Sequence, residues 1–470
     1  MMEYKENQFL SLFNKQKANQ YSIANTTYKE RIKKLNALKK AIEVTYRNAI
    51  RIALYKDMKR HESEVDLLDI FPVVSEIKIA KKELKKWMKK QDVETPLSLI
   101  GSSSWIHYEP KGVCLIISPW NFPINLTFGP LVSAIAAGNT IIIKPSEITS
   151  NTSKVMQQII NDLFDENEVA LVQGPVETST QLLELPFNHI FFTGSPIVGK
   201  IVMKAAAENL TSVTLELGGK SPTIIDETAN IKSAAKRIAW GKFTNNGQTC
   251  IAPDYIFVHE TVKDKFIETL KNQIQEFYGS DASTSKSYSR VVNEKHFIRL
   301  KNYIKDAKNK GAEIVFGGNY NDEDNYIEPT LITNLTQDAS IMHDEIFGSV
   351  LPLLTFNKLE ETIAYINANE KPLALYIYSK SKKNINYILK NTRAGSTGIN
   401  NNVVQFSNHY LPFGGSNNSG IGKTHGVYGF QEFSNMRSVL KQHTKSAIEL
   451  LFPPYTNLKQ KIIDLTIKWL

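Results

Sequence analysis

Three residues in polar or glycine-containing stretches could carry chemistry, and the first is a cysteine. Cys250 ends the run Phe243-Thr-Asn-Asn-Gly-Gln-Thr and precedes Ile-Ala-Pro. A nucleophilic cysteine needs partial exposure and a stabilised thiolate, and small polar neighbours favour the exposure. A buried structural thiol is the commoner fate of a lone cysteine. Cys114, inside the apolar run 113–117, fits that alternative, and Cys250 does not.

The second residue is Glu216, in the run Val213-Thr-Leu-Glu-Leu-Gly-Gly-Lys-Ser-Pro. A glutamate between two leucines is ordinarily an outward-facing strand residue. The two glycines that follow indicate that the backbone approaches something closely. A carboxylate in a partly desolvated cleft has a raised pKa and can act as a base near neutral pH.

The third residue is Asn121, in Ile117-Ser-Pro-Trp-Asn-Phe-Pro. Asparagine before an aromatic residue and a proline is often only a turn former. Its side-chain amide can also donate to a developing oxyanion, an interaction worth roughly 3 kcal/mol in hydrolases. Both interpretations stay open from the residues alone.

A glycine-containing turn points to phosphate binding. The segment Thr193-Gly194-Ser195-Pro-Ile-Val-Gly199 follows an apolar run ending at Phe192 and opens a helix predicted over 197–208. Free N–H groups at a helix N-terminus can bind a pyrophosphate. This glycine spacing is a weak signal on its own, because it is not the three-glycine dinucleotide fingerprint.

The elements that must position these residues alternate regularly after Val93. Short β-branched or apolar runs are separated by helical patterns, which predicts a parallel sheet covered on both faces, the doubly wound arrangement of nucleotide-binding domains. A second α/β region follows over about 215–394, and no flexible linker separates the two. The expected strands are 112–117, 140–144, 169–172, 189–192, 255–258 and 313–316, and the expected helices are 131–137, 153–163, 179–183, 197–208 and 262–278.

Composition limits the class of protein. A chain of 470 residues exceeds one hydrophobic core, so two or three domains are expected. Two cysteines exclude a disulfide scaffold and favour a reduced, cytoplasmic setting. The polar N-terminus does not have the pattern of a signal peptide. The most apolar stretch, 112–143, is interrupted by prolines and asparagines and is no membrane span.

The net charge of +9 raises the question of an acidic partner. Lysines cluster over 29–60 and 78–90. In the second run Ile77, Ala80 and Leu84 recur at helical spacing, which places the lysines on a solvated helix face. Attraction to anionic lipid or an acidic cofactor is the alternative. No nucleic-acid motif accompanies the charge, so no nucleic-acid partner is expected, and no metal site is expected.

Taken together, the motifs identify a resemblance. The chain resembles the aldehyde dehydrogenase superfamily, and within it the class 3 and fatty aldehyde dehydrogenase branch, from about residue 20 to the tail. The resemblance is carried, in family order, by PWNFP, AAGNTIIIKPSE, FFTGSPIVGK, LELGGKSP, GQTC, EPTL, DEIFG, LPFGG and PPY.

The resemblance implies a role for each matching residue. Cys250 is the expected nucleophile, Glu216 the general base, and Asn121 the oxyanion amide, joined by the backbone N–H of Cys250. The expected reaction oxidises an aldehyde to a carboxylic acid through a thiohemiacetal and a thioester. The cofactor contacts that the resemblance implies are Lys144, Glu147, Thr193, Gly194, Ser195, Gly199, Glu345 and Phe347.

NAD is the expected cofactor, with NADP tolerated. Glu147 beside the ribose would repel a 2′-phosphate, whereas Lys144 would attract one, and the class 3 branch often accepts both. The implied substrates are medium- or long-chain aliphatic aldehydes, or aromatic ones. Two positions depart from the family pattern: Asn417 stands where glycine is common, which positive φ would tolerate, and Ser349 stands where proline is usual.

The expected architecture combines pattern and resemblance. It has a cofactor-binding domain over 1–96 and 111–214, and a catalytic domain over 215–410. A small β bridging arm over 97–110 and 429–441 would form a homodimer, and a tail helix lies within 442–470. The tail places Leu458, Ile462, Leu465 and Trp469 on one face. That face suits packing on protein, with peripheral membrane contact as the alternative.

Three other functions compete with this prediction. A CoA-acylating dehydrogenase would generally lack the base that matches Glu216. An inactive scaffold homologue should have lost Cys250, Asn121 or Glu216, yet all three are present. A thioesterase would leave the cofactor residues Lys144 and Glu345 unexplained.

Overall fold

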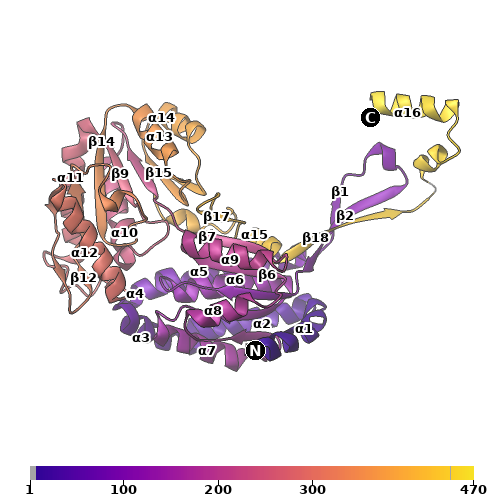
Figure 1. The fold of residues 1–470 in the computed structure, drawn as a ribbon, viewed down its shortest axis with the longest axis horizontal. Coiled ribbons are helices and arrows are strands. Elements are labelled where there is room, and N and C mark those ends of the chain that lie inside the picture. Colours follow the sequence, from indigo (N-terminus) through magenta and orange to yellow (C-terminus); the bar gives the residue numbers. More distant parts are fainter. Residues whose placement is uncertain (1–6, 445, 470) are drawn as a thin grey trace, which may run out of the picture.

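The computed structural model describes residues 7–444 and 446–469. Two α/β lobes form the body, and a narrow arm leaves it and carries the C-terminal helix at its far end (Figure 1). The first lobe contains the N-terminal half of the chain, drawn in indigo to magenta. The second lobe is drawn mainly in orange. The predicted α/β class with parallel sheets is confirmed.

The first lobe is built on a sheet with strand order β17-β7-β6-β3-β4-β5, in which only β17 is antiparallel to its neighbour. Its central strands are buried on both faces, as their β-branched runs require. The strands are β3 (Val113–Ile117), β4 (Thr140–Lys144), β5 (Val169–Leu171), β6 (His189–Gly194), β7 (Ser212–Leu217) and β17 (Gly420–Ile421).

Helices cover both faces of this sheet (Figure 1). The most buried of them, α6, begins at Pro123, eight residues before the predicted start at Leu131, and keeps Pro130 inside. The helices are α1 (Leu10–Ala24), α2 (Tyr28–Lys40), α3 (Arg47–Met58), α4 (Glu62–Val65), α5 (Phe71–Trp87), α6 (Pro123–Ala137), α7 (Ser150–Leu163), α8 (Val176–Leu183), α9 (Pro196–Ala207) and α15 (Gly426–Glu432), with the π-helical turns η1 (Ala41–Thr45) and η2 (Asp66–Ile70).

Chain order reverses between β3 and β6. From β3 the chain proceeds outward to β4 and β5, then crosses back to β6 and β7. Ligands of doubly wound sheets bind outside the carboxyl ends of the strands at such a reversal. Asn121 lies in the segment that follows β3. Gly194 is the last residue of β6, and Ser195 follows it.

The second lobe has a sheet with strand order β10-β13-β14-β9-β8-β15-β16, parallel except for β10 against β13. The strands are β8 (Pro222–Ile225), β9 (Tyr255–His259), β10 (Glu313–Phe316), β13 (Thr330–Thr333), β14 (Val350–Phe356), β15 (Ala374–Tyr378) and β16 (Ser396–Ile399), beside the hairpin β11 (Tyr320–Asn321) and β12 (Tyr326–Ile327). The helices are α10 (Ile231–Phe243), α11 (Lys263–Tyr278), α12 (Glu294–Asn309), α13 (Leu359–Ala368) and α14 (Lys382–Asn391), with 3-10 turns η4 (Thr244–Gly247), η5 (Glu260–Val262), η6 (Ser340–Met342) and η7 (Val404–Ser407).

The arm is an antiparallel sheet with strand order β1-β2-β18. Its strands are β1 (Gln91–Val93), β2 (Ser102–Pro110) and β18 (Ser434–Gln442). The arm therefore pairs two segments that lie far apart in the sequence. The turns η3 (Leu97–Leu99) and η8 (Ala447–Leu451) and helix α16 (Asn457–Trp469) lie at its outer end (Figure 1). No described residue of α16 is buried, so the tail does not dock on the body of its own chain; its predicted end at Leu470 lies outside the described residues.

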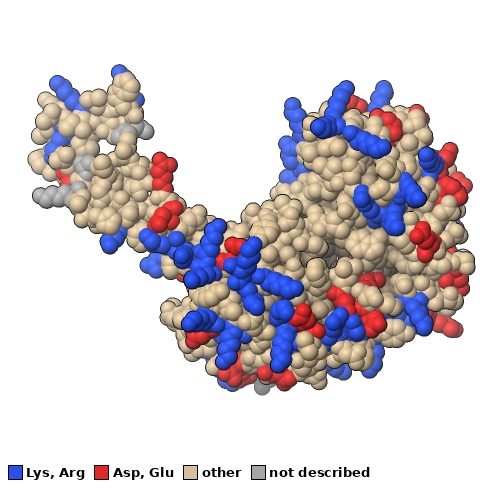
Figure 2. All heavy atoms as spheres, turned by 180° about the vertical axis from the view of Figure 1, so that it is seen from behind, with Lys and Arg blue, Asp and Glu red and all other residues tan. Residues whose placement is uncertain are grey.

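The lysine-rich helix α5 has the predicted amphipathic form. Ile77, Ala80 and Leu84 are buried in the first lobe, and most of its lysines are exposed. Figure 2 shows Lys and Arg side chains gathered on the surface where the arm leaves the body. Among the described helices, none combines the length and apolar character that a membrane crossing would need.

Candidate active site

A cavity of about 590 Å³ lies between the two lobes. The three residues with predicted chemical roles, Cys250, Glu216 and Asn121, all line it, together with Glu345 and Phe347. The structure therefore brings together side chains that lie far apart in the sequence, between residues 121 and 347.

The loop before Cys250 is held in an unusual backbone conformation. Asn245, Asn246 and Gly247 follow one another at φ +51°, +56° and +73°. A Cβ on Gly247 would collide with the carbonyl oxygen of Gly348, so only glycine fits there. Consecutive left-handed residues are strained and persist only where their surroundings fix them.

Hydrogen bonds from Gln248 supply part of that fixation. Its Nε2 donates to the carbonyl oxygens of Asn245 and Arg290, at 3.0 and 3.1 Å. Its Oε1 accepts from the N–H of Val292 at 3.0 Å. The side chain is fully buried, where lost hydrogen bonds cost most. Gln248 thus anchors the loop that delivers Cys250 to the cavity.

Asn121 is buried and held from two sides. Its Nδ2 donates to the carbonyl oxygen of Gln248 at 3.1 Å, and its own carbonyl oxygen accepts from Asn245 Nδ2 at 2.9 Å. The amide of Asn121 and the loop of Cys250 are therefore parts of one hydrogen-bonded unit, which suits two groups that must act on the same carbonyl oxygen.

A buried ion pair supports Asn121 from behind. Arg60 Nη1 lies 2.6 Å from Asp69 Oδ2 and donates to the Asn121 carbonyl oxygen at 3.3 Å. Asp69 Oδ1 also accepts from the N–H groups of Ile124 and Asn125, in the first turn of α6. Sequence reasoning missed this network, because nothing in the helical pattern around residues 60–69 marks either side chain as buried.

Glu216 lies near the end of β7 and is 6% exposed. Neither carboxyl oxygen has a hydrogen-bond partner among the described residues. Burial raises the pKa of Glu216 well above its usual value, an effect that Lys423 opposes and Glu432 reinforces. A carboxyl group without a partner is free to bind a water or a proton, as a general base must.

Lys423 and Glu432 were not predicted from the sequence. Lys423 Nζ donates to the carbonyl oxygens of Gly414 and Gly415, and its backbone N–H donates to Glu432 Oε1 at 3.1 Å. A Cβ on Gly414 would lie 3.0 Å from Glu216 Oε1, so the lysine is tethered next to the glutamate. The LPFGG motif pointed only to Gly414 and Gly415. Lys423 lies eight residues beyond Gly415 and outside the motif, so the sequence did not mark it.

Glu345 lines the same cavity and lies against Gly218. A Cβ on Gly218 would collide with its carboxyl group, so the glycine after Glu216 leaves room for this side chain. Burial, with a contribution from Asp254, raises the pKa of Glu345 to about 8. The ring of Phe347 meets that of Trp120 edge-on at 5.3 Å, which closes the cavity beside them.

The predicted phosphate-binding turn begins beside Glu216, because Thr193 on β6 pairs with Glu216 on β7. Thr193, Gly194 and Ser195 line the cavity, and Ser195 Oγ caps α9 by accepting from Val198 N–H at 3.4 Å. Gly199 does not line it; a Cβ there would lie 2.7 Å from Leu217 Cδ2. Gly199 therefore serves the close packing of α9 on β7.

Lys144 and Glu147 lie at the end of β4, outside the cavity lining. Lys144 Nζ and Glu147 Oε2 form an ion pair at 2.8 Å, with Lys144 buried and Glu147 partly exposed. The arrangement fits a dinucleotide, because the N-terminus of α9 lies at the cavity and a helix N-terminus attracts phosphates.

The two cysteines differ in access. Cys114 is 0% exposed within β3, and burial raises the pKa of its thiol to about 12. Cys250 is partly exposed and lines the cavity. Loss of solvation in the cavity, with Glu345 and Glu216 nearby, raises the pKa of its thiol as well.

Comparison with known proteins decides the family. Residues 2–439 match the model of the aldehyde dehydrogenase family. The chain belongs to the aldehyde dehydrogenase family. It is an enzyme of this class, and enzymes of the family use NAD or NADP. The predicted class 3-like branch is confirmed by its relatives.

Three similar proteins illustrate the relationship. The 4,4′-diaponeurosporen-aldehyde dehydrogenase of Staphylococcus aureus is 47% identical, over 91% of this chain and 92% of its own. The dimeric NADP-preferring aldehyde dehydrogenase of Rattus norvegicus is 40% identical, over 90% and 93%. The solved structure of the substrate-bound state of Staphylococcus aureus AldH superposes with a TM-score of 0.93 at 44% identity, over 97% and 99%.

Both departures from the family pattern have a structural explanation. Asn417 has φ +55°, the conformation that asparagine tolerates better than most side chains. Ser349 is buried, and its hydroxyl donates to the carbonyl oxygen of Ile327 at 3.2 Å. Neither departure disturbs the position of Glu216 or Cys250 at the cavity.

Proposed function

We propose that this aldehyde dehydrogenase oxidises its substrate through covalent catalysis by Cys250. After the Cys250 thiol gives up its proton to water, the thiolate attacks the aldehyde carbon and the C=O π bond breaks. The resulting oxyanion accepts hydrogen bonds from Asn121 Nδ2 and the Cys250 N–H. The observation that carries the proposal is the convergence of Cys250, Glu216 and Asn121 on one cavity. The rigid loop before the cysteine supports it, because a nucleophile must be held in one geometry.

The bound nicotinamide supplies the hydride acceptor that turns the thiohemiacetal into a thioester. Glu345 and Phe347 would hold its ribose and position its ring, and Thr193, Gly194 and Ser195 would bind the phosphates. Lys144 and Glu147 would contact the adenosine ribose. Gly199, which the resemblance placed near the phosphates, instead serves to seat the helix that presents them.

Release of the acid requires a base. Glu216 takes a proton from water, which attacks the thioester carbon and frees Cys250. A strongly ionised carboxylate would be a poor base, and burial of Glu216 supports a raised pKa suited to this step. The competing transfer to coenzyme A would leave this glutamate without a role.

The substrates we propose are medium- or long-chain aliphatic aldehydes, or aromatic ones. The cavity lining includes the aromatic side chains of Trp120, Phe406 and Phe413, which suit an apolar substrate. The Staphylococcus aureus relative acts on 4,4′-diaponeurosporen-aldehyde, which favours the long-chain end of this range.

NAD is the proposed preference, with NADP tolerated. The Lys144–Glu147 pair leaves Glu147 partly exposed, where it would repel a 2′-phosphate. The rat relative is named NADP-preferring, so the cofactor preference of this chain has to be measured. A higher kcat/KM with NADP than with NAD would contradict the proposal.

We further propose a cytoplasmic homodimer formed through the arm, with the domain boundaries predicted from the sequence. The exposed β18 edge and the apolar surface of α16 support association with protein, and peripheral contact with a membrane is the alternative. Light scattering that shows only monomer would remove the dimer.

The decisive experiment is a screen for NADH release with aldehydes of rising chain length and with aromatic aldehydes. We expect one equivalent of NADH and one of carboxylic acid per aldehyde consumed. The same reaction with coenzyme A added should give no acyl-CoA. Formation of acyl-CoA, or NADH release without acid, would refute hydrolysis by Glu216.

A further inference from the structure

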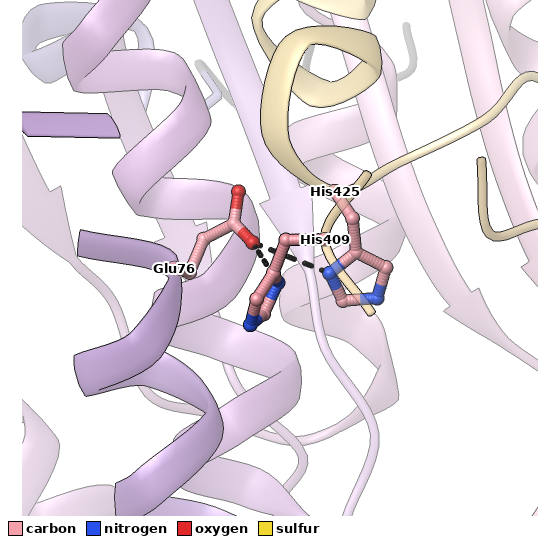
Figure 3. Close-up of side chains that lie close together, drawn as sticks. All are labelled: Glu76, His409 and His425. Carbon is pink, nitrogen blue, oxygen red and sulfur yellow. Dashed lines mark hydrogen bonds and ion pairs between the residues drawn. The ribbon is translucent and has the colours of Figure 1, made fainter. Parts of the chain in front are cut away.

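Three buried side chains outside the proposed reaction centre meet at one point. Glu76 comes from α5, His409 from the loop after η7, and His425 from the residue before α15 (Figure 3). Glu76 Oε2 lies 2.6 Å from His409 Nδ1 and 3.3 Å from His425 Nδ1. We refer to Glu76, His409 and His425 as the partition.

The partition is held together by direct contacts. The other oxygen of Glu76, Oε1, accepts from the Gly426 N–H at 2.7 Å. Burial alone would raise the pKa of Glu76, yet the contacts with His409 and His425 lower it to about 2. These residue types can also bind a metal ion, but both Glu76 oxygens are already in contact with nitrogen groups, so the geometry favours a closed cluster of direct contacts.

Hollows lie on both sides of the partition. Glu76 and His425 line the cavity that contains Cys250. His409 lines a second hollow of about 530 Å³, which we call the outer groove. His409 and Glu76 touch, so the two hollows are separated by little more than these side chains.

One face of α5 runs beneath both hollows. Pro72 and Glu76 line the cavity, and Ile79, Glu83 and Lys86 line the outer groove. These spacings of three and four residues keep all five on one side of a helix. At about 1.5 Å per residue, the stripe from Pro72 to Lys86 is about 21 Å long. The cavity and the groove therefore lie in series.

The walls of the outer groove suit a hydrocarbon chain. Half of the groove's lining residues are aromatic or aliphatic, among them Ile79, Trp87, Val427 and Phe430. The rest are polar or charged, and they include Lys86, Lys89 and Lys90. Lysine stems cover apolar surface while their ammonium groups stay in water. Figure 2 shows the basic side chains gathered where the arm leaves the body.

We propose that the outer groove is a second substrate-binding site, which holds the distal part of a long-chain aldehyde whose carbonyl group is at Cys250. This inference rests on the proposed function and extends it to the substrate class. The inner cavity also has to contain the cofactor's nicotinamide end, so a long chain needs further apolar surface. The groove in line with it along α5 provides that surface.

The chain would enter the groove through the partition. His409 is itself buried, but its neighbours Asn408 and Tyr410 are exposed, so entry of the substrate requires the His409 side chain to move outward toward that surface. His425 is fixed more firmly, at φ +74°, between Glu76 and the rings of Phe406 and Phe413. Its Nε2 is buried without a hydrogen-bond partner among the described residues. Displacing His409 still leaves Glu76 bonded to His425 and Gly426.

The test fills the groove without touching the inner cavity. Ile79 lines the groove, and its Cγ2 would lie 3.9 Å from a Cβ on Gly426. Ile79→Trp should lower kcat/KM for hexadecanal about tenfold or more, as a blocked apolar pocket does, and leave hexanal within about twofold. Lys78→Trp, one residue away and exposed, is the matched control and should change neither value. Val427→Trp, on the facing wall, should repeat the effect of Ile79→Trp.

The outcomes distinguish a failure of the second binding site from a failure of the proposed aldehyde oxidation. Equal losses for hexanal and hexadecanal, or no loss for either, with unfolding temperatures like that of the parent enzyme, would overturn the second site. Conversion of the groove variants to monomers in light scattering would overturn it too, since a second copy would then be the occupant. A parent enzyme that oxidises no aldehyde would refute the proposed function itself.

Discussion

The loop before Cys250 and the arm carrying α16 are opposite in construction. In the loop, polar side chains such as Asn245 and Gln248 are fully buried and hydrogen-bonded within one chain. In the arm, large apolar side chains such as Met436, Leu440 and Trp469 are 62%, 52% and 74% exposed. The loop therefore buries polar side chains whose partners lie on the same chain, whereas the arm exposes apolar side chains that have no cover from the same chain.

The difference shows which parts of the molecule are determined by a single chain. The loop gains its strained conformation from contacts on the same chain, so it is already in place before any ligand binds. The arm leaves an edge strand and an apolar helix in water, which single proteins avoid unless another surface covers them. The first region fits the proposed chemistry, and the second fits the proposed association.

The largest effect expected is loss of the nucleophile. Cys250→Ser should lower kcat by about 10³-fold or more, because a hydroxyl cannot replace the thiolate. NAD binding, measured by calorimetry, should persist. The matched control is Cys114→Ser, which changes the same residue type inside β3 and should keep most of the activity per folded molecule. Normal turnover by Cys250→Ser would end the assignment.

The rigidity of the loop is tested next. Gly247→Ala combines a positive φ with a collision against Gly348. It should destabilise the protein by roughly 1–3 kcal/mol in urea unfolding and reduce kcat. Gly279→Ala has φ +82° with open space around it, so it should cost roughly 1 kcal/mol and spare activity. Identical behaviour of the two variants would show that the loop needs no precise shape.

A smaller effect is expected on the pH dependence of hydrolysis when the charge beside Glu216 is removed, and its direction can be predicted. Lys423 opposes the burial that raises the pKa of Glu216. Glu216 acts as a base only when ionised, so hydrolysis should increase with pH up to that pKa. Lys423→Met should move this limb to higher pH, by about one unit, in stopped-flow measurements after the NADH burst. Lys390→Met, exposed and remote, should leave the limb in place; a shift to lower pH for Lys423→Met would contradict the sign.

The arm should matter least for chemistry and most for assembly. Leu440→Asp places a charge on β18, and we expect light scattering to show monomers because an interface core does not accommodate an unpaired charge. The kcat for hexanal per active site should stay within about twofold. Leu210→Asp, 94% exposed on the body, is the control and should remain dimeric. A dimeric Leu440→Asp variant would place the interface elsewhere.

The same division explains what the sequence could predict. Apolar runs such as 113–117 and 140–144 allowed the parallel sheet to be predicted. Each strand is buried on both faces, so its continuous apolar pattern is visible within a few consecutive residues. The motifs located Cys250, Glu216 and Asn121, although their proposed roles rest on the resemblance. The supporting role of Arg60 and Asp69 could not be predicted, because it depends on hydrogen bonds to residues 61 and 55 positions away in the sequence. Nor could Lys423, which acts through proximity to Glu216 in space.

The contrast between the two thiols also allows intact reaction centres to be counted by thiol labelling. With only two cysteines in the chain and one of them sealed inside a β-strand, a thiol reagent applied to native enzyme has a single accessible target per chain. Labelling stoichiometry then reports the fraction of intact reaction centres in a preparation, and its protection by bound ligand reports their occupancy. Unfolding should double the count, which provides an internal calibration.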